Sequence, residues 1–141
     1  MLGIDVGRRR IGLAISDRSG TLARPLETLT LSETSAEQIA DRVAESIARL
    51  SEDEDGLGTI VVGLPTRLDG SPNDETPHVE AFIGALRRRT TVPVVSEGER
   101  LSSREAESRL AIGERDWRKR KLKLDAAAAA VILQDYLDRR D

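Results

Sequence analysis

The stretch that decides the fold of this chain is "MLGIDVGRRRIGLAISD" (residues 1–17). Residues 2–6 and 10–16 are short apolar or alternating runs separated by a glycine and three arginines, so they predict two antiparallel strands joined by a tight turn. Residues 21–29 continue as a third strand at the edge of the sheet, because Pro25 cannot donate a hydrogen bond to a neighbouring strand. Asp5 is unusual in the first strand, since aspartate is depleted in strands and is almost never buried without a partner.

Helical and strand patterns alternate after the third strand. Apolar residues at helical spacing predict a helix over 35–50, with Ser35 or Thr34 as its N-cap, and a second helix that starts at Thr76 and Pro77. Apolar runs predict strands over 59–65 and 92–97, and two further helices are predicted over 102–111 and over the alanine-rich segment 122–137. The order β-β-β-α-β-α-β-α-α predicts an α/β protein with a mixed five-stranded sheet and helices on both faces. This order is similar to that of the ribonuclease-H-like fold.

Composition narrows the class of protein and of metal site. A length of 141 residues is typical of one domain, which we expect to span residues 1–141. The chain has no cysteine and a single histidine, His78, which excludes a disulfide framework and thiolate zinc sites. Any metal must therefore have oxygen ligands, which are those that Mg²⁺ and Mn²⁺ prefer.

Hydropathy and charge patterning bear on location and partners. No run of about 18 apolar residues occurs and the first residues already form a strand pattern, so we expect no membrane span, no signal peptide and a cytoplasmic protein. The net charge of −3 gives no support for nucleic-acid binding as an overall property. The segment "RDWRKRKLK" (115–123) is strongly basic, however, and would either direct a polyanion to one face or form a solvated basic loop.

Three acids lie where strands end or a helix starts. Asp5 interrupts the first strand, Glu99 follows the strand at 92–97, and Asp125 lies near the start of the alanine-rich helix. If they converged, the carboxylates would repel one another unless a cation compensated their charge. Two divalent ions about 3.5–4 Å apart would do so while activating water and stabilising the leaving oxygen of a phosphodiester. Gly3 and Gly7 flank Asp5 and would allow a backbone to approach it closely.

Each acid also has a purely structural interpretation. Asp5 would cap a turn at the end of its strand, and Glu99 would be an exposed loop charge. Asp125 would be a helix N-terminal charge that the macrodipole favours. The metal-site hypothesis therefore depends on the three acids meeting in the fold.

Four motifs resemble, in order and spacing, those of the YqgF or RuvX family of Holliday-junction-resolvase-like nucleases. They are "LGIDVGRRRIGLAISD" (2–17), "VVGLPTRLDGS" (61–71), "GERLSSREAE" (98–107) and "LDAAAAAVILQDYL" (124–137). The first two motifs are highly specific, and the resemblance runs from Leu2 to Leu137. It implies a ribonuclease-H-like fold in a bacterial cytoplasmic nuclease that either resolves Holliday junctions or processes the 5′ end of pre-16S ribosomal RNA during ribosome biogenesis.

The resemblance also implies a site and its partners. The family's acidic residues fall on Asp5, Glu99 and Asp125, which would be catalytic and would bind Mg²⁺ or Mn²⁺. The implied partners are pre-rRNA or branched DNA and ribosomal precursor particles, for a monomer or homodimer with no membrane association. One residue departs from the pattern, because Gly98 stands where the first aspartate of an Asp-Glu-Arg motif is expected. Losing that carboxylate would weaken metal binding if it is a ligand. The loss would matter little if that carboxylate only orients the ligands and does not bind the metal itself.

Basic residues beside these motifs are candidates for binding phosphates. Three arginines follow Asp5 in a turn, where solvation is the alternative role, and Arg100 would contact the scissile phosphate or pair with an acid. Thr66, Arg67 and Asp69 are expected in a loop above the carboxyl ends of the strands, where Asp69 with Gly70 would alternatively form only a turn. The nucleic-acid-binding candidates are Arg8, Arg9, Arg10, Arg67, Arg100, Arg118, Lys119, Arg120 and Lys121.

Two other functions compete with a nuclease. The first is a non-catalytic nucleic-acid-binding or ribosome-assembly factor that kept the fold, which the glycine at position 98 would favour. The second is an actin- or sugar-kinase-type ATPase, because "IDVG" followed by "GLAISD" also resembles the first phosphate loop of that superfamily. Those ATPases need two such domains and a second phosphate loop, which this sequence lacks, so we discount that function.

Overall fold

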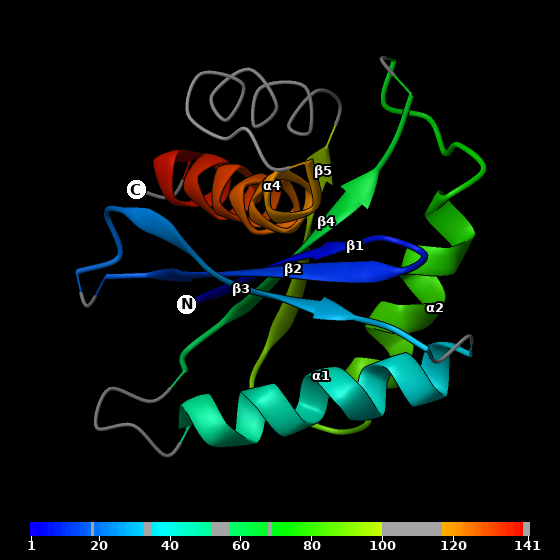
Figure 1. Cartoon of the computed structure of the whole chain (residues 1–141), viewed down its shortest axis with the longest axis horizontal. Helices are drawn as coiled ribbons and strands as arrows, with labels where there is room; N and C mark the ends of the chain where they lie inside the picture. The colour runs from blue at the N-terminus through cyan, green and yellow to red at the C-terminus, as the bar shows by residue number, and fades with distance from the viewer. Residues whose placement is uncertain (18, 33–34, 52–56, 68, 100–116, 140–141) are drawn as a thin grey trace.

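The fold is described from a computed structural model of the chain. The structure describes residues 1–17, 19–32, 35–51, 57–67, 69–99 and 117–139, with their side chains except those of Glu99 and of residues 117–124. Within these residues, five strands form one sheet with helices on both of its faces, as the sequence predicts (Figure 1).

The sheet is mixed, with the strand order β3-β2-β1-β4-β5. The central strand β1 pairs antiparallel with β2 and parallel with β4, while β3 and β5 form the two edges. Because β1, β4 and β5 are parallel, their carboxyl ends meet at one side of the sheet. The strands are Leu2–Val6 (β1), Arg10–Ser16 (β2), Ala23–Thr30 (β3), Ile60–Pro65 (β4) and Val94–Glu99 (β5).

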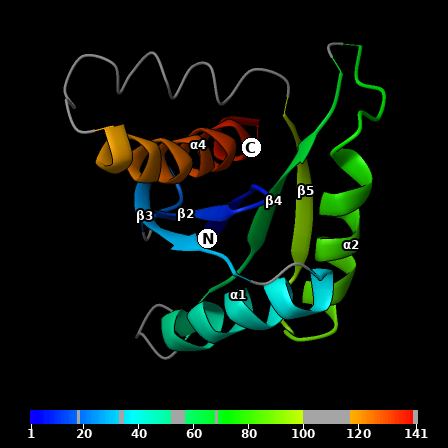
Figure 2. The same ribbon diagram turned by 45° about the vertical axis from the view of Figure 1, so that its right-hand side comes forward.

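The helices form two layers. On one face lie α1 (Ala36–Ser51) and α2 (Thr76–Arg87), and α4 (Trp117–Arg139) crosses the other face (Figures 1 and 2). The Ser35 hydroxyl accepts a hydrogen bond from the backbone N–H of Gln38 at 3.1 Å, so Ser35 is the N-cap of α1, one of the two residues predicted. No helix in the described parts of the chain has an apolar stretch long enough to span a membrane.

The predicted bounds of several elements are shifted, and two of these shifts concern the site. The last helix begins at Trp117 rather than at residue 122, because the lysines and arginines that precede the alanine run are themselves good helix formers. The fifth strand covers Val94–Glu99 rather than 92–97, because its pairing with β4 continues as far as Pro65 opposite Glu99. The predicted helix over 102–111 lies outside the described residues.

Alternation along the strands separates two apolar cores. Leu2 and Ile4 of β1 are fully buried in the larger core, which α1 and α2 cover. On the opposite face Val61 of β4 and Leu133 of α4 belong to a second, smaller core. Side chains alternate along β1, so Asp5 lies on the same face as Gly3, which α4 covers, and on the opposite face from Ile4.

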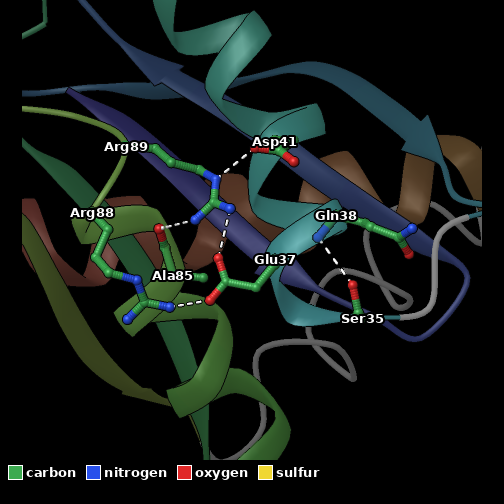
Figure 3. A network of polar contacts seen from close by, with 7 residues as sticks. All are labelled: Ser35, Glu37, Gln38, Asp41, Ala85, Arg88 and Arg89. Atoms are coloured by element: carbon green, nitrogen blue, oxygen red, sulfur yellow. Dashed lines mark hydrogen bonds and ion pairs between the residues drawn. The ribbon is translucent and has the colours of Figure 1, made fainter.

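Ion pairs join α1 to α2 outside the larger core (Figure 3). Arg89 of the segment after α2 contacts Glu37 and Asp41 of α1, at 2.6 Å each, and Arg88 also pairs with Glu37. A further guanidinium hydrogen bond goes from Arg89 to the carbonyl of Ala85, at 2.8 Å. This network orients the two helices on the face away from α4.

Two glycines let α4 lie directly on the sheet backbone. A Cβ atom at Gly12 would be 1.9 Å from the carbonyl oxygen of Asp125, and one at Gly3 would be 2.7 Å from Cβ of Leu133. Atoms cannot approach so closely, so only glycine fits at either position while α4 stays in place. The two glycines therefore determine how deeply α4 sits on β1 and β2.

Candidate active site

Asp5 lies at the carboxyl end of β1, on the face that α4 covers, and it is partly buried. Burial, and to a smaller extent the charge of Asp125, raise the pKa of the Asp5 carboxyl from 3.8 to about 7. The strand position thus brings a carboxyl into an environment that penalises its charge.

Asp125 reaches Asp5 from α4. It is the ninth residue of this helix, counted from Trp117, so it lies beyond the first turn, and the alternative interpretation as an N-terminal charge that the macrodipole favours does not hold. Its carboxylate instead accepts a hydrogen bond from Nε of Arg10 at 2.6 Å, from a residue 115 positions earlier. Gly12, which the Asp125 carbonyl overlies, is the register partner of Asp5 in the β1–β2 ladder.

The two aspartates lie in an open cleft of about 450 Å³. Its walls come from the ends of β1 and β4, from the segment before α2 and from α4. The lining residues are Asp5, Val6, Gly7, Arg8, Gly63, Pro65, Thr66, Asn73, Glu75 and Asp125. The cleft is at the carboxyl ends of the parallel strands, where α/β sheets commonly bind ligands.

The predicted third acid, Glu99, ends β5 as the register partner of Pro65, and its side chain is outside the description. Two residues before it, Glu97 is buried and lies on the α4 face, where its carboxylate contacts Arg139 at 2.5 Å. Burial raises the pKa of Glu97, Arg139 lowers it and Asp135 raises it. The Glu97 carboxylate thus pairs with Arg139 at the C-terminal end of α4.

Gly98 lies on the opposite face of β5 from Glu97. Its register partner Leu64 packs against the larger core, and a Cβ atom added to Gly98 would meet nothing within 4 Å. Because adjacent residues of a strand face opposite sides of the sheet, Glu97 does not take the place of a side chain at position 98. An aspartate at position 98 would point away from the face of Asp5.

The predicted basic residues are in several different places. Arg8 lines the cleft and pairs with Glu75 at 2.8 Å, whereas Arg10 pairs with Asp125 and Arg9 is exposed in the same turn. The turn is closed by a hydrogen bond from the N–H of Gly7 to the carbonyl of Arg10, at 2.9 Å.

The loop after β4 is a turn beside the cleft. The Asp69 carboxylate accepts hydrogen bonds from the N–H and hydroxyl of Ser71, at 2.9 and 2.6 Å, which is the turn-forming role anticipated for it. Thr66 lines the cleft, while Arg67 is exposed and its N–H donates to the carbonyl of Ser71. Arg100 lies outside the described residues, as do the side chains of Arg118, Lys119, Arg120 and Lys121, whose backbone belongs to α4.

The described part of the site suits a hard cation. Among the described side chains no three Asp, Glu, His or Cys residues form a metal-binding group, and Asp5 with Asp125 supplies two carboxylates. Both donors are oxygen, and a divalent cation between them would relieve the repulsion that raises the pKa of Asp5. The residues present therefore fit a divalent cation that prefers oxygen ligands.

Sequence reasoning did not single out two features of the cleft. Arg10 was assigned to phosphates, although its partner is Asp125, because a contact between residues 115 positions apart has no local signal. Glu75 is absent from the sequence-predicted site residues, although it immediately precedes the helix start that Thr76 and Pro77 indicate. That position was a usable signal, because a helix that follows β4 must begin near the carboxyl end of the sheet.

Comparison with known protein families and curated proteins finds relatives that match nearly the whole chain. A family model described as RuvX, Holliday junction resolvase, matches residues 1–139. A protein of Anaeromyxobacter sp. (strain Fw109-5), named "Putative pre-16S rRNA nuclease", is 45% identical over 139 residues, which are 99% of this chain and 96% of that protein. A protein of the same name from Desulforudis audaxviator (strain MP104C) is 39% identical over 140 residues, with 99% and 94% covered.

Solved structures agree with the fold. T. thermophilus RuvC in complex with a Holliday junction substrate superposes with a TM-score of 0.58 at 19% identity, over 99% of this chain and 96% of that one. A second T. thermophilus RuvC structure gives a TM-score of 0.55 at 19% identity, with the same coverage. The fold prediction is confirmed: the sheet and its helices are ribonuclease-H-like. With the match to the family model over almost its whole length, the chain belongs to the RuvX family of Holliday junction resolvases.

Proposed function

We propose that the chain is a metal-dependent endonuclease that hydrolyses phosphodiester bonds in structured nucleic acid. One observation carries this proposal: carboxyls from β1 and α4 meet in an open cleft at the carboxyl ends of the strands, and the pKa of Asp5 is raised to about 7. Such an arrangement opposes folding unless a ligand uses it, and strongly perturbed acids in clefts are typical of functional sites.

Asp5 and Asp125 would hold the ion, Mg²⁺ or Mn²⁺. By the two-residue repeat of a strand we expect the Glu99 side chain on the same face, where it would complete the ligand set. A bound divalent ion supplies the Lewis acidity that activates water and stabilises the charge that develops on the leaving oxygen. Arg10 holds the Asp125 carboxylate in place by the hydrogen bond of 2.6 Å.

The basic residues around this centre would bind the substrate backbone. Arg8 lines the cleft itself, and Arg9 and Arg67 are exposed in the loops beside it. We assign Arg100 and the basic start of α4, with Arg118, Lys119, Arg120 and Lys121, to the same role, because contacts to phosphates position a nucleic acid without reading its sequence.

We propose the 5′ end of pre-16S rRNA as the first substrate and four-way DNA as the second. The names of the curated relatives, at 39–45% identity over nearly the whole chain, support the first choice. The family description supports the second, while the likeness to RuvC at 19% identity concerns the fold alone. Association with ribosomal precursor particles, a cytoplasmic location, and a single domain over residues 1–141 that acts as a monomer or homodimer complete the proposal.

Cleavage assays on both substrates test this function. We expect the wild-type chain to cut a 5′-extended 16S rRNA fragment in Mg²⁺ or Mn²⁺, and Asp5→Asn and Asp125→Asn to lose that activity while they remain folded. Asp138→Asn is the matched control, because Asp138 is exposed on the same helix and accepts a hydrogen bond from the Gln134 amide, away from the cleft. A wild-type chain that cuts neither substrate would contradict the proposal.

The non-catalytic alternative makes a different prediction. A binding factor would hold RNA or DNA with a salt-dependent affinity that falls when the basic residues of segment 115–123 are replaced. It would show no cleavage, and Mn²⁺ would not raise its unfolding temperature. The cleavage and metal-binding measurements together separate the two functions.

A further inference from the structure

An ion pair crosses the cleft that holds Asp5 and Asp125. Arg8, in the turn between β1 and β2, places its NH2 group 2.8 Å from Oε1 of Glu75, and its Nε donates to both carboxylate oxygens, at 3.1 and 3.3 Å. Both residues line the cleft, and their side chains are 74% and 43% exposed. The pair is thus accessible to any polyanion that enters the cleft.

The backbone of Glu75 is held firmly on its side of the cleft. The Asn73 carboxamide oxygen accepts hydrogen bonds from the N–H groups of Glu75 and Thr76, at 2.8 and 3.1 Å. The Thr76 hydroxyl, which is buried, donates to the carbonyl of Pro65 at the end of β4, at 2.6 Å. These bonds tie the start of α2 to the sheet, so Glu75 presents its side chain from a fixed point.

The side chain of Glu75 does not stabilise its own helix by capping. Glu75 occupies the N-cap position of α2, yet its carboxylate makes no capping hydrogen bond and is directed to Arg8 instead. A glutamate that only served the helix would be expected to contact the N–H groups of the first turn. The contact across the cleft is therefore the main interaction of this carboxylate.

We propose that Glu75 is a specificity-determining residue that occupies the Arg8 guanidinium in the free protein. A substrate phosphate then binds Arg8 only by displacing the Glu75 carboxylate. This inference rests on the proposed function, because it concerns how nucleic acid enters the same cleft. The exchange is feasible, since an exposed arginine–carboxylate pair contributes little stability and a phosphate accepts the same two parallel hydrogen bonds. Glu75 thereby weakens the binding of anions that cannot also engage the rest of the site.

The exchange predicts a coupling between the two residues that simple charge repulsion does not. If Glu75 acts by occupying Arg8, Glu75→Gln strengthens binding only while Arg8 is present. If Glu75 merely repels phosphates through space, the same substitution strengthens binding equally in an Arg8→Gln background. A double-mutant cycle measures this difference directly.

The test is binding by the metal-free chain, in EDTA, to a labelled RNA hairpin and to a synthetic four-way DNA junction. We expect Glu75→Gln to tighten binding about two- to fivefold at low salt, and the double variant to bind as weakly as Arg8→Gln. Arg8→Gln should also reduce the slope of log K against log salt concentration by about 0.7 on single strands or 0.9 on duplex. The controls are Glu27→Gln and Arg49→Gln, which break an exposed pair of 3.0 Å outside this cleft and should leave binding unchanged.

The outcomes separate this inference from the nuclease proposal. A gain from Glu75→Gln that persists without Arg8, or an unchanged affinity and salt slope in Arg8→Gln, overturns the exchange. A chain that shows the predicted coupling in EDTA but cuts no substrate in Mn²⁺ supports the exchange and overturns only the nuclease function. Absence of wild-type binding to both probes in EDTA overturns the exchange, whereas the nuclease function is decided by cleavage in Mg²⁺ or Mn²⁺.

Discussion

The backbone carbonyl of Asp125 lies over Gly12, so closely that a Cβ atom on Gly12 would be 1.9 Å from the carbonyl oxygen. Gly12 is also the register partner of Asp5 in the antiparallel pairing of β1 and β2. The close contact between α4 and β2 is therefore what brings a carboxyl of the last helix to the carboxyl of the first strand.

Replacing Gly12 with alanine should force α4 away from the sheet. We expect Gly12→Ala to lower the free energy of unfolding by about 1–3 kcal/mol or more, because a methyl group has no space between two backbones. Urea unfolding measures this, with Gly58→Ala as the control, because a Cβ atom there meets nothing within 4 Å. A Gly12→Ala variant as stable as the wild type would contradict the contact.

Asp5 should make stability depend on pH in the direction opposite to an ordinary surface carboxylate. The pKa of Asp5 is raised to about 7 in the folded chain, against 3.8 for the ordinary carboxyl, so between these values the folded state keeps a proton that the unfolded state has lost. The free energy of unfolding should therefore fall as pH rises from about 4 to about 7, and then level off.

Asp5→Asn should remove this fall in the free energy of unfolding with rising pH. At pH 8 it should be more stable than the metal-free wild type by on the order of 4 kcal/mol, whereas below pH 4 the two should be similar. Chemical unfolding at a series of pH values, in EDTA, checks the prediction. Glu97, whose pKa is also raised, should leave a residual slope in the variant. Equal slopes in both proteins would show that Asp5 has an ordinary pKa.

Arg10 should act as the resident counter-charge of the acid pair. Arg10→Gln removes a partly buried hydrogen bond to a carboxylate, so we expect it to cost about 1–3 kcal/mol of stability in EDTA. Mn²⁺ should recover part of that loss, because a cation can take the place of the guanidinium. Thermal unfolding with and without Mn²⁺ measures both effects. Arg49→Gln is the control, expected to stay within about 0.5 kcal/mol of the wild type. A loss that Mn²⁺ leaves unchanged would argue against a cation site at these acids.

Restoring the family aspartate at position 98 should not strengthen the metal site. The strand register puts residue 98 on the face opposite Asp5, in open space, so Gly98→Asp should fold normally and bind Mn²⁺ as the wild type does. Glu99→Gln should instead reduce the stabilisation by Mn²⁺. Calorimetric titration of the two variants measures both affinities. A clear gain of Mn²⁺ affinity in Gly98→Asp would mean that the family aspartate is itself a ligand.

The strands β1 and β2 and the start of α2 could be predicted because their signals are local. Apolar alternation marks Leu2–Val6 and Arg10–Ser16 without reference to the rest of the chain, and Thr76 with Pro77 marks the first turn of α2. The two shifted boundaries at the site share a cause. The end of β5 depends on how far its neighbour β4 extends, and the start of α4 lies in a basic segment with no apolar pattern to mark it.

By itself, the sequence determined the order of the described elements, the mixed sheet and the selection of Asp5 and Asp125 as candidate acids, because composition, periodicity and motif are properties of the chain. Only the tertiary structure decided what those acids contact. Arg10 turned out to pair with Asp125 rather than to stand free for phosphates, and Arg8 with Glu75 across the cleft. Such pairings depend on the depth at which α4 lies on Gly3 and Gly12 and on where α2 begins beside β4, and these are distances between elements that no local pattern encodes.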